Sequence, residues 1–304
     1  MAATTQRANV TSIDELTFHN DAVSLCMLVN RRHQVVRVID FRAGATIAKR
    51  NFVLTTARRE NIEKLFVLVE RDEVATWNRL GFRREGSIPS FYRRSDAWIM
   101  GAVVANVGPV RTERAYDDDD DDDIVDEPNP AAELADKAID KAKKLVKETA
   151  DKAVPATKVA TIKRDAAMKG VAALQKSGRA LTGFELFSRD ADRHFLVSSG
   201  KGGFELLASY ELQPSFASAM LELLTSPRDE AERLLTVSSI RSLMSQVAEK
   251  GAISTFALAP SDDLSLSSCY LANGFRKSAV LASHLNVGGR RRDAIVWSKK
   301  LGDN

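Results

Sequence analysis

The same short phrase occurs twice in this chain of 304 residues, nearly two hundred positions apart. "NRLGFRREG" runs over residues 78–86, and "LANGFRKSA" runs over residues 271–279. Each copy follows a stretch of helical character and precedes a strand-like one, and Gly commonly ends a helix in the left-handed conformation. A chain of this length can also bury two cores. We therefore expect one structural unit to occur twice.

The stretches around the phrase repeat in the same order. Before it, "KLFVLVERDE" and "STFALAPSDD" are apolar runs typical of buried strands, and each closes on acidic residues that suit the start of a helix. Further upstream, a strand and a long helix are predicted at 35–41 and 44–60, and again at 216–224 and 229–250. After it, both copies predict two strands, the last beginning with Asp-Ala. The order strand, long helix, strand, short helix, two strands is thus written twice.

The second copy is preceded by a predicted hairpin at residues 194–212. Its turn, "GKGG", lacks the spacing and the following Ser or Thr of a phosphate-binding loop, so we interpret it as turn chemistry.

An acidic run separates the two copies. "YDDDDDDDIVDEPNP" (116–130) has no apolar surface to bury, and we expect it to be extended and solvated. An amphipathic helix is predicted at 131–154 and a second Ala/Lys-rich helix at 156–177. We expect a helical spacer here. A basic helix for DNA or a membrane surface is the alternative, but the interspersed acids weaken the field that phosphate contact needs.

Bulk properties fit a soluble globular chain, with 44% hydrophobic and 28% charged residues and a net charge of only +3. The two cysteines, Cys26 and Cys269, cannot form a disulfide framework and fit no zinc spacing. The N-terminus lacks the layout of a signal peptide, and no apolar run is long enough to span a membrane. We predict a cytoplasmic protein without a metal or a membrane association.

The repeated order of elements, with "Y-x-x-x-G-F" at the end of the short helix, resembles the core of the GNAT acetyltransferase superfamily. The resemblance covers about residues 35–105 and 190–301. It implies an α/β fold of two GNAT-like mixed-sheet units, at residues 1–110 and 181–304, joined by an acidic and Ala/Lys-rich helical linker at 111–180. "GFRREGSIPSFYRRSDAWIM" is also similar to the C-terminal stretch of bacterial beta-lysine acetyltransferases. Because only 34 residues precede the strand at 35–41, we expect the family's opening strands to be missing from the first unit, and the two units to need each other to complete a sheet.

The resemblance implies acetyl-CoA as cofactor, with its pyrophosphate held where the long helix begins. The family's R/Q-x-x-G-x-G/A pattern is missing from the second copy, where Arg228 and Arg233 are expected to compensate in part. The first copy keeps a remnant, with Gly44 in place and Arg42 one residue out of register. A strand amide near Leu224 would polarise the thioester carbonyl.

The family's acid, usually a tyrosine four residues before the Gly of "GF", falls on Tyr270 in the second copy; the first copy has Trp77 there, which we expect in the core. A core position is the alternative for Tyr270. His284 is a candidate base, and Cys269 is expected to be a buried thiol rather than a nucleophile. Arginines recur in the two final hairpins and are either solvated or bind an acidic acceptor or a phosphate: Arg93, Arg94, Arg290, Arg291 and Arg292.

Three functions remain open from the sequence. The first is an acetyl-CoA-dependent N-acetyltransferase acting on an amine of a small molecule or protein, with the C-terminal unit working. The second is a catalytically inactive GNAT-derived protein that binds a ligand or a protein partner as a scaffold. The third is a nucleic-acid-associated protein. The sequence does not predict the acceptor or the oligomeric state.

Overall fold

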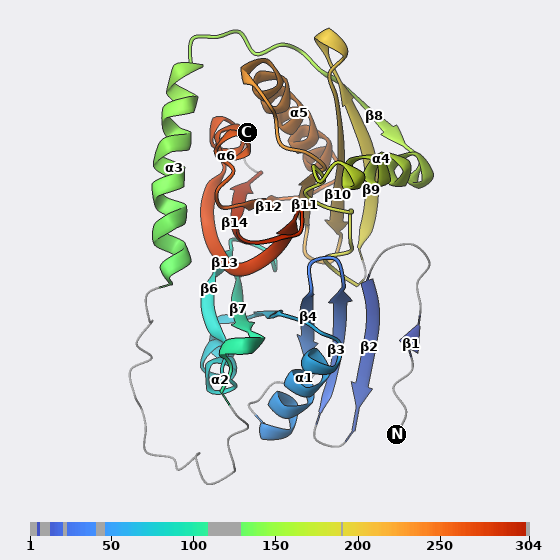
Figure 1. Cartoon of the computed structure of the whole chain (residues 1–304), viewed down its shortest axis with the longest axis vertical. Coiled ribbons are helices and arrows are strands. Elements are labelled where there is room, and N and C mark those ends of the chain that lie inside the picture. Colours follow the sequence, from blue (N-terminus) through green and yellow to red (C-terminus); the bar gives the residue numbers. More distant parts are fainter. Residues whose placement is uncertain are drawn as a thin grey trace.

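The computed structural model describes residues 5–6, 13–20, 23–40, 46–108, 129–189 and 191–301. All the strands in these ranges belong to one fourteen-stranded mixed sheet, flanked by helices (Figure 1). The predicted α/β fold with mixed sheets is therefore confirmed. The acidic run and the pair Arg42 and Gly44 lie outside the described residues.

The first half of the molecule contains β1 to β7. Its elements are β1 (Thr5–Gln6), β2 (Ile13–His19), β3 (Ser24–Asn30), β4 (Val35–Asp40), α1 (Ile47–Arg59), β5 (Lys64–Val69), α2 (Val74–Arg79), β6 (Arg83–Ile88) and β7 (Ala97–Val103). β2 and β3 precede β4 in an antiparallel hairpin, so the expectation that the opening strands are missing was wrong. The pattern of β2 was overlooked because its polar residues alternate with few large apolar ones.

The second half contains α3 to β14. Its elements are α3 (Pro130–Glu148), β8 (Lys158–Ile162), α4 (Arg164–Lys176), β9 (Asp192–Ser199), β10 (Glu205–Gln213), β11 (Ser218–Leu223), α5 (Glu230–Glu249), β12 (Ser254–Pro260), α6 (Leu264–Ala272), β13 (Arg276–Val287) and β14 (Arg290–Lys300). The helix predicted at 156–177 is instead a strand followed by a helix, since a segment with the β-branched residues Val159, Thr161 and Ile162 pairs with β9.

The order of strands across the sheet reads the same from either end. It runs β1-β2-β3-β4-β5-β7-β6, then β13-β14-β12-β11-β10-β9-β8. In each half one pair is parallel, β4 with β5 and β11 with β12, and the remaining pairs are antiparallel. The two halves thus have the same order of elements and meet edge to edge at β6 and β13, stacked one above the other in Figure 1.

Turn residues repeat along with the strands. Gln34 and Ala217 both adopt positive φ (49° and 51°) in the hairpins before the parallel pairs. Gly81 and Gly274 end the two short helices at φ 86° and 76°, which is the left-handed stop expected of the repeated phrase.

The helical part of the chain between the halves is packed rather than free. α3 begins at the Asn129 cap and buries Ala131, Ala135 and Ile139 in the core of the second half, beside α6. α4 buries Val171 in a smaller cluster with residues of the second half. The predicted amphipathic helix is thus present as α3, and its apolar stripe packs on the second half.

Candidate functional site

In each half the two parallel strands diverge from one another at the same register. β4 and β5 pair from Val35 opposite Lys64 to Val38 opposite Val67, and then diverge. β11 and β12 pair from Ser218 opposite Ser254 to Leu221 opposite Ala257. Beyond these points the two parallel strands no longer pair with each other. Each half therefore has a gap between them in which a ligand or another chain can lie.

In the first half the gap opens into a cavity of about 510 Å³, which we call the first cleft. Its lining comes from both sides of the gap and from the second half. The lining residues are Arg37, Val38, Ile39, Asp40, Val67, Leu68, Val69, Glu70, Glu73, Tyr92, Ser188, Arg189, Gln213, Ser215 and Phe216. The cleft is therefore apolar along the strands and charged at both ends.

Tyr92 reaches the first cleft from the loop between β6 and β7. Its hydroxyl donates to the carbonyl of Leu68, 3.2 Å away, at the point where β5 has left β4. Burial raises the pKa of Tyr92 to about 12, so the phenol keeps its proton at neutral pH. Burial also raises the pKa of Glu73, at the acidic end of the cleft.

In the second half the same gap is occupied by the chain itself. Residues 181–188, the crossing segment, pass between the two halves after α4. The Leu181 amide donates to the Leu224 carbonyl (2.8 Å), and the Thr182 hydroxyl donates to Glu222 (2.7 Å). The amides of Phe187 and Ser188 both donate to Glu211 (2.8 and 2.7 Å). A segment of the chain therefore covers this part of the second half, bound to side chains of β10, β11 and β12.

A buried ionic cluster fixes the crossing segment. Arg193 on β9 contacts Glu222 and lies 2.5 Å from Glu211, and it also donates to the Glu185 carbonyl (2.6 Å). All three charged side chains of this cluster are over nine-tenths buried. Because the two carboxylates hold the guanidinium charged, the pKa of Arg193 is raised despite its burial.

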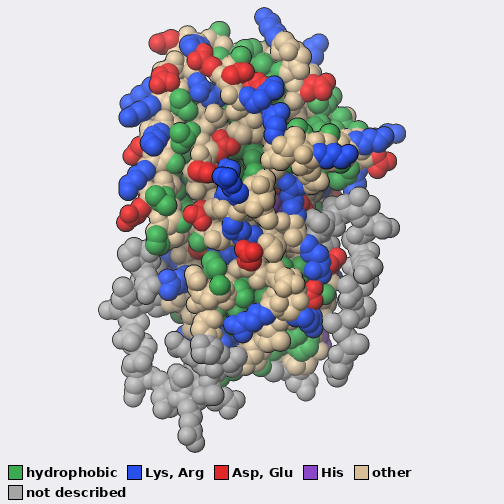
Figure 2. Space-filling view, viewed as in Figure 1, with side chains coloured by type: hydrophobic (Ala, Val, Ile, Leu, Met, Phe, Trp, Pro, Cys, Tyr) green, Lys and Arg blue, Asp and Glu red, His purple; other side chains and the backbone are tan. Residues whose placement is uncertain are grey.

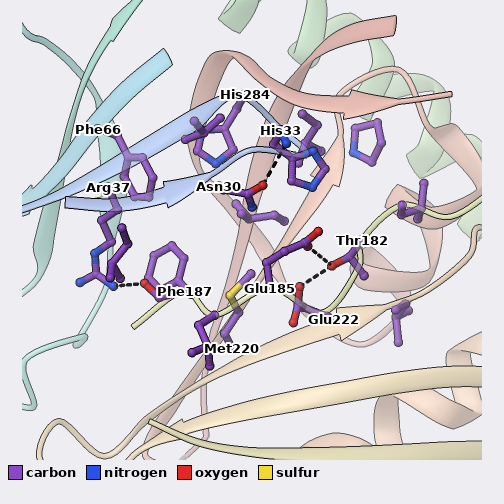
Figure 3. A pocket seen from close by; sticks show the side chains of 18 residues that line it. Asn30, His33, Arg37, Phe66, Thr182, Glu185, Phe187, Met220, Glu222 and His284 are labelled. Carbon is purple, nitrogen blue, oxygen red and sulfur yellow. Dashed lines mark hydrogen bonds between the residues drawn. The ribbon is translucent and has the colours of Figure 1, made fainter. Parts of the chain in front are cut away.

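A smaller cavity, the central cavity, lies between the two halves and measures about 80 Å³ (Figure 3). His33 and His284 lie near one another along it, with Phe66 and Met220 and with the crossing segment on its other side. Burial lowers the pKa of His33 to about 4 and lowers that of His284 well below its usual value. Both rings are neutral at pH 7, and the cavity has room for only a few water-sized groups.

The residues predicted for the second half do not form an open site. Tyr270 is 1% exposed, lies against Phe275 and Trp297, and has a pKa raised far above its usual value by burial. The Leu224 amide already donates to the Leu207 carbonyl (2.9 Å), so it is not free to polarise a thioester. Both residues occupy core positions.

The two predicted phosphate-binding arginines lie at the start of α5. Arg228 contacts Glu232, and Arg233 lies 3.9 Å from Glu230. A cavity of about 390 Å³ is found here, and Arg228 lines it together with Asp229 and Glu232, whereas Arg233 does not line it. This part of the second half thus has no excess of positive charge.

The hairpin arginines hold the two halves together. Arg93 donates to the Pro214 carbonyl (3.3 Å), and Arg291 donates to the carbonyls of His33 and, at 3.3 Å, Gln34. Arg292 pairs with Asp262 (3.2 Å). Each hairpin therefore contacts the turn before the parallel pair of the other half. Arg93 stays exposed, as expected of a solvated charge, whereas that interpretation was wrong for Arg291.

The other predicted side chains are buried. Trp77 lies in the core as expected, and Cys269 is a buried thiol whose pKa burial raises to about 12. His284 faces the central cavity rather than the first cleft. The sequence analysis missed Arg37, although a charged residue inside the apolar run "VVRVID" was a signal that could have drawn attention to it.

Several solved structures resemble about half of this chain. A putative acetyltransferase from Sphaerobacter thermophilus DSM 20745 is 13% identical with a TM-score of 0.38, and the match covers 48% of this chain and 94% of that one. The ribosomal-protein-S18-alanine N-acetyltransferase from Escherichia coli is 12% identical with a TM-score of 0.37, and the match covers 49% of this chain and 96% of that one. The spermidine N-acetyltransferase from Vibrio cholerae, in complex with CoA and spermine, is 11% identical with a TM-score of 0.38. That match covers 48% of this chain and 95% of the other. No family model and no curated protein matches the chain.

Among the described residues, no helix is both long enough and apolar enough to cross a membrane.

Proposed function

We propose that the chain is an acetyl-CoA-dependent N-acetyltransferase whose working cleft is the first cleft. The proposal comprises two GNAT-like units, residues 1–110 and 181–304, with 111–180 connecting them. The observation that carries it is the parting of β4 and β5 into an open cavity of about 510 Å³. This reverses the expectation from the sequence that the C-terminal unit works.

The closed half supports the idea that the open half binds an extended amide chain. Just after β11, the Leu181 amide donates to the Leu224 carbonyl (2.8 Å), so a backbone carbonyl at the parting of the strands accepts from an amide. The pantetheine arm of CoA is an extended chain with amide groups, and it would bind to the strand edges beyond Val38 and Val67 through the backbone groups that Tyr92 does not occupy. The bound cofactor would supply an activated acyl thioester.

The lining of the first cleft suits acyl transfer. The Tyr92 hydroxyl carries a proton at neutral pH and is directed at the gap, where it can protonate a departing thiolate. Glu70 and Glu73 place carboxylates at one end, where they can bind an ammonium group and accept its proton. Tyr92 thus takes the role that the sequence analysis assigned to Tyr270.

Calorimetry with acetyl-CoA on the full chain tests this proposal. Leu68→Trp places an indole in the first cleft, while Ala231→Trp fills the cavity at the start of α5 and is a matched control, since Ala231 is exposed. We expect micromolar binding that Leu68→Trp reduces at least tenfold and Ala231→Trp leaves unchanged, with thermal unfolding confirming that both variants fold.

Other results would favour the alternatives. Loss of binding in Ala231→Trp alone would assign the cofactor to the second half. No binding by the unmodified chain would sink the enzyme and favour an inactive scaffold that binds protein partners. Nucleic-acid binding is the weakest candidate, because lysines on and near α3 pair with acids, as in Lys143 with Asp140 and Lys277 with Asp136. Both signs of charge also alternate across the face shown in Figure 2.

A further inference from the structure

Arg37 is a partly buried cation in the lining of the first cleft. It projects from β4 toward the second half, one residue before β4 and β5 part. Its Nη1 donates to the Phe187 carbonyl and to the Ser188 hydroxyl (2.8 Å), and its guanidinium lies 4.6 Å from the centre of the Phe187 ring. Two features of the crossing segment therefore fix where the guanidinium lies.

The rest of the guanidinium has no counterpart in the protein. Within the described ranges Arg37 makes no ion pair, and its Nε is buried without a hydrogen-bond partner. The nearest buried carboxylate, Glu211, is bound by Arg193 and by two amides. Burial lowers the pKa of Arg37, whereas Arg193 in the second half has two carboxylates. Glu211 attracts the guanidinium but is already bound elsewhere, so this cation has room for an anion from outside.

The fold itself does not require an arginine here. Arg37 lies opposite Leu28 two residues after the hairpin-closing pair Asn30 and Val35. The residue at the same register in the second half is Met220, which lies opposite Glu211. A methionine therefore suffices at this position of the sheet, and the charge of Arg37 serves another purpose.

Arg37 lines both the first cleft and the central cavity. In Figure 3 the guanidinium points away from the histidines of the central cavity, with its engaged nitrogen turned to Phe187. Nε and Nη2 form the other edge, a fork that matches the two oxygens of a carboxylate. Along the cleft, Arg37 and Arg189 thus stand apart from Glu70 and Glu73, and Tyr92 lies within electrostatic reach of both ends.

We infer that Arg37 binds a carboxylate of the substrates, so that the enzyme acylates an amine that also carries a carboxylate, such as an amino acid. This rests on the proposed function. In the reaction the amine nitrogen bonds to the acyl carbon, the carbon–sulfur bond breaks, the amine loses one proton and the thiolate gains one. The carboxylate at Arg37 is unchanged. The same chemistry could come from the acyl group of a dicarboxylic acyl-CoA.

Matched substrates test the inference. Thiol release would be followed with acetyl-CoA and pairs of acceptors that differ only in the carboxylate: lysine against 1,5-diaminopentane, and phenylalanine against phenethylamine. Succinyl-CoA against acetyl-CoA, with the plain amines, tests the acyl group as the source. The variants are Arg37→Gln and Arg37→Lys, with Arg94→Gln as control because Arg94 is an exposed arginine of the neighbouring hairpin.

We expect at least one carboxylate-bearing acceptor to be preferred by about 10- to 100-fold in kcat/KM, mainly through KM, as a charge-assisted hydrogen bond implies. Arg37→Gln should abolish that preference, Arg37→Lys should retain part of it, and Arg94→Gln should change nothing. A preference for succinyl-CoA that is lost in Arg37→Gln would support the inference with the acyl group as source.

Equal rates within every pair, or a preference that survives in Arg37→Gln, would overturn the inference and leave the proposed function standing. An absence of thiol release with every pair of substrates would overturn both. Because Arg37→Gln is compared on two acceptors, a general loss of folded enzyme lowers both rates and is not mistaken for a lost preference.

Discussion

The two gaps between parallel strands differ in what fills them, although the strands around them have the same order and register. In the second half the crossing segment lies in the gap, and Glu222 and Glu211 hold it through Thr182 and two amides. At the register of Glu222 the first half has Ile39, and at that of Glu211 it has Leu28. The first half therefore cannot hold a peptide through buried carboxylates, and its gap stays open to a ligand.

The comparison also shows what each half contributes to the whole. The crossing segment lines the central cavity beside one gap with residues 181–187, and its Ser188, followed by Arg189, borders the other gap. A closed second half thus forms a wall of the first cleft. On this interpretation the second half is a structural partner of the working half, and the two cannot be separated without loss of the site.

The largest effect is expected from breaking the ionic cluster of the second half. Arg193→Met leaves Glu211 and Glu222 buried without their counter-charge, which should lower the free energy of unfolding by about 3–5 kcal/mol. The matched variant Arg37→Met removes a cation that has no ion pair in the described ranges, and should change stability by less than about 1 kcal/mol. Urea unfolding of both variants measures the difference, and equal losses would contradict the assignment of Arg37 to a ligand.

A second variant tests whether the halves fold as one body. Gly86 joins β6 to β13 at φ 137°, and a Cβ there would lie 2.4 Å from the Ala279 Cβ. Gly86→Ala should cost about 3 kcal/mol or more, from backbone strain and overpacking together. Gly108→Ala is the control, since nothing lies within 4 Å of its added Cβ. A small loss in Gly86→Ala, seen by thermal unfolding, would mean that the junction contributes little.

Acid should weaken the interface through His33. Its Nδ1 accepts a hydrogen bond from the Asn286 amide (3.0 Å), which requires an unprotonated nitrogen. Burial lowers the pKa of His33 by more than the attraction of Glu185 raises it, and the nearby Arg32 and Arg291 lower the pKa further. The folded pKa of about 4 lies below the unfolded value of about 6.5. The stability that His33 contributes is therefore complete above pH 6.5 and is lost as the pH falls toward 4, by roughly 3 kcal/mol.

His33→Asn isolates this effect, because the amide oxygen can replace Nδ1 as acceptor. Unfolding free energies of both proteins would be measured between pH 7 and 4, so that carboxylates common to both cancel. Parallel curves for the two proteins would show that His33 is not the group that titrates.

How far the sequence leads can be seen from particular residues. The repeated "GFR" phrase predicted two short helices ending at Gly81 and Gly274, because a left-handed stop is a local property. The closure of the second gap was not predictable, since it depends on contacts between Thr182 and Glu222, forty residues apart. β8 was missed for the same reason, because its pairing with β9 overrides an Ala/Lys-rich surrounding that favours helix.

The choice of Tyr270 over Tyr92 shows the same limit. Tyr270 stands four residues before the Gly of "GF", so a motif points to it. Tyr92 lies in a loop with no motif, and only the fold brings its hydroxyl to Leu68 in the open gap. Sequence spacing finds a position within a unit, but it does not show which of two units is open.

The smallest effect is expected from Tyr270→Phe, and it makes the sharpest distinction between the halves. Since Tyr270 lies in the core of the closed half, loss of its hydroxyl should leave acetyl transfer unchanged within about twofold and stability within about 1 kcal/mol. Tyr92→Phe removes the same atom from the open cleft and should lower kcat by about 10²-fold or more, as loss of a general acid does. If instead Tyr270→Phe were the damaging change, the crossing segment would have to leave the second gap during turnover, and the closed half would be the working one.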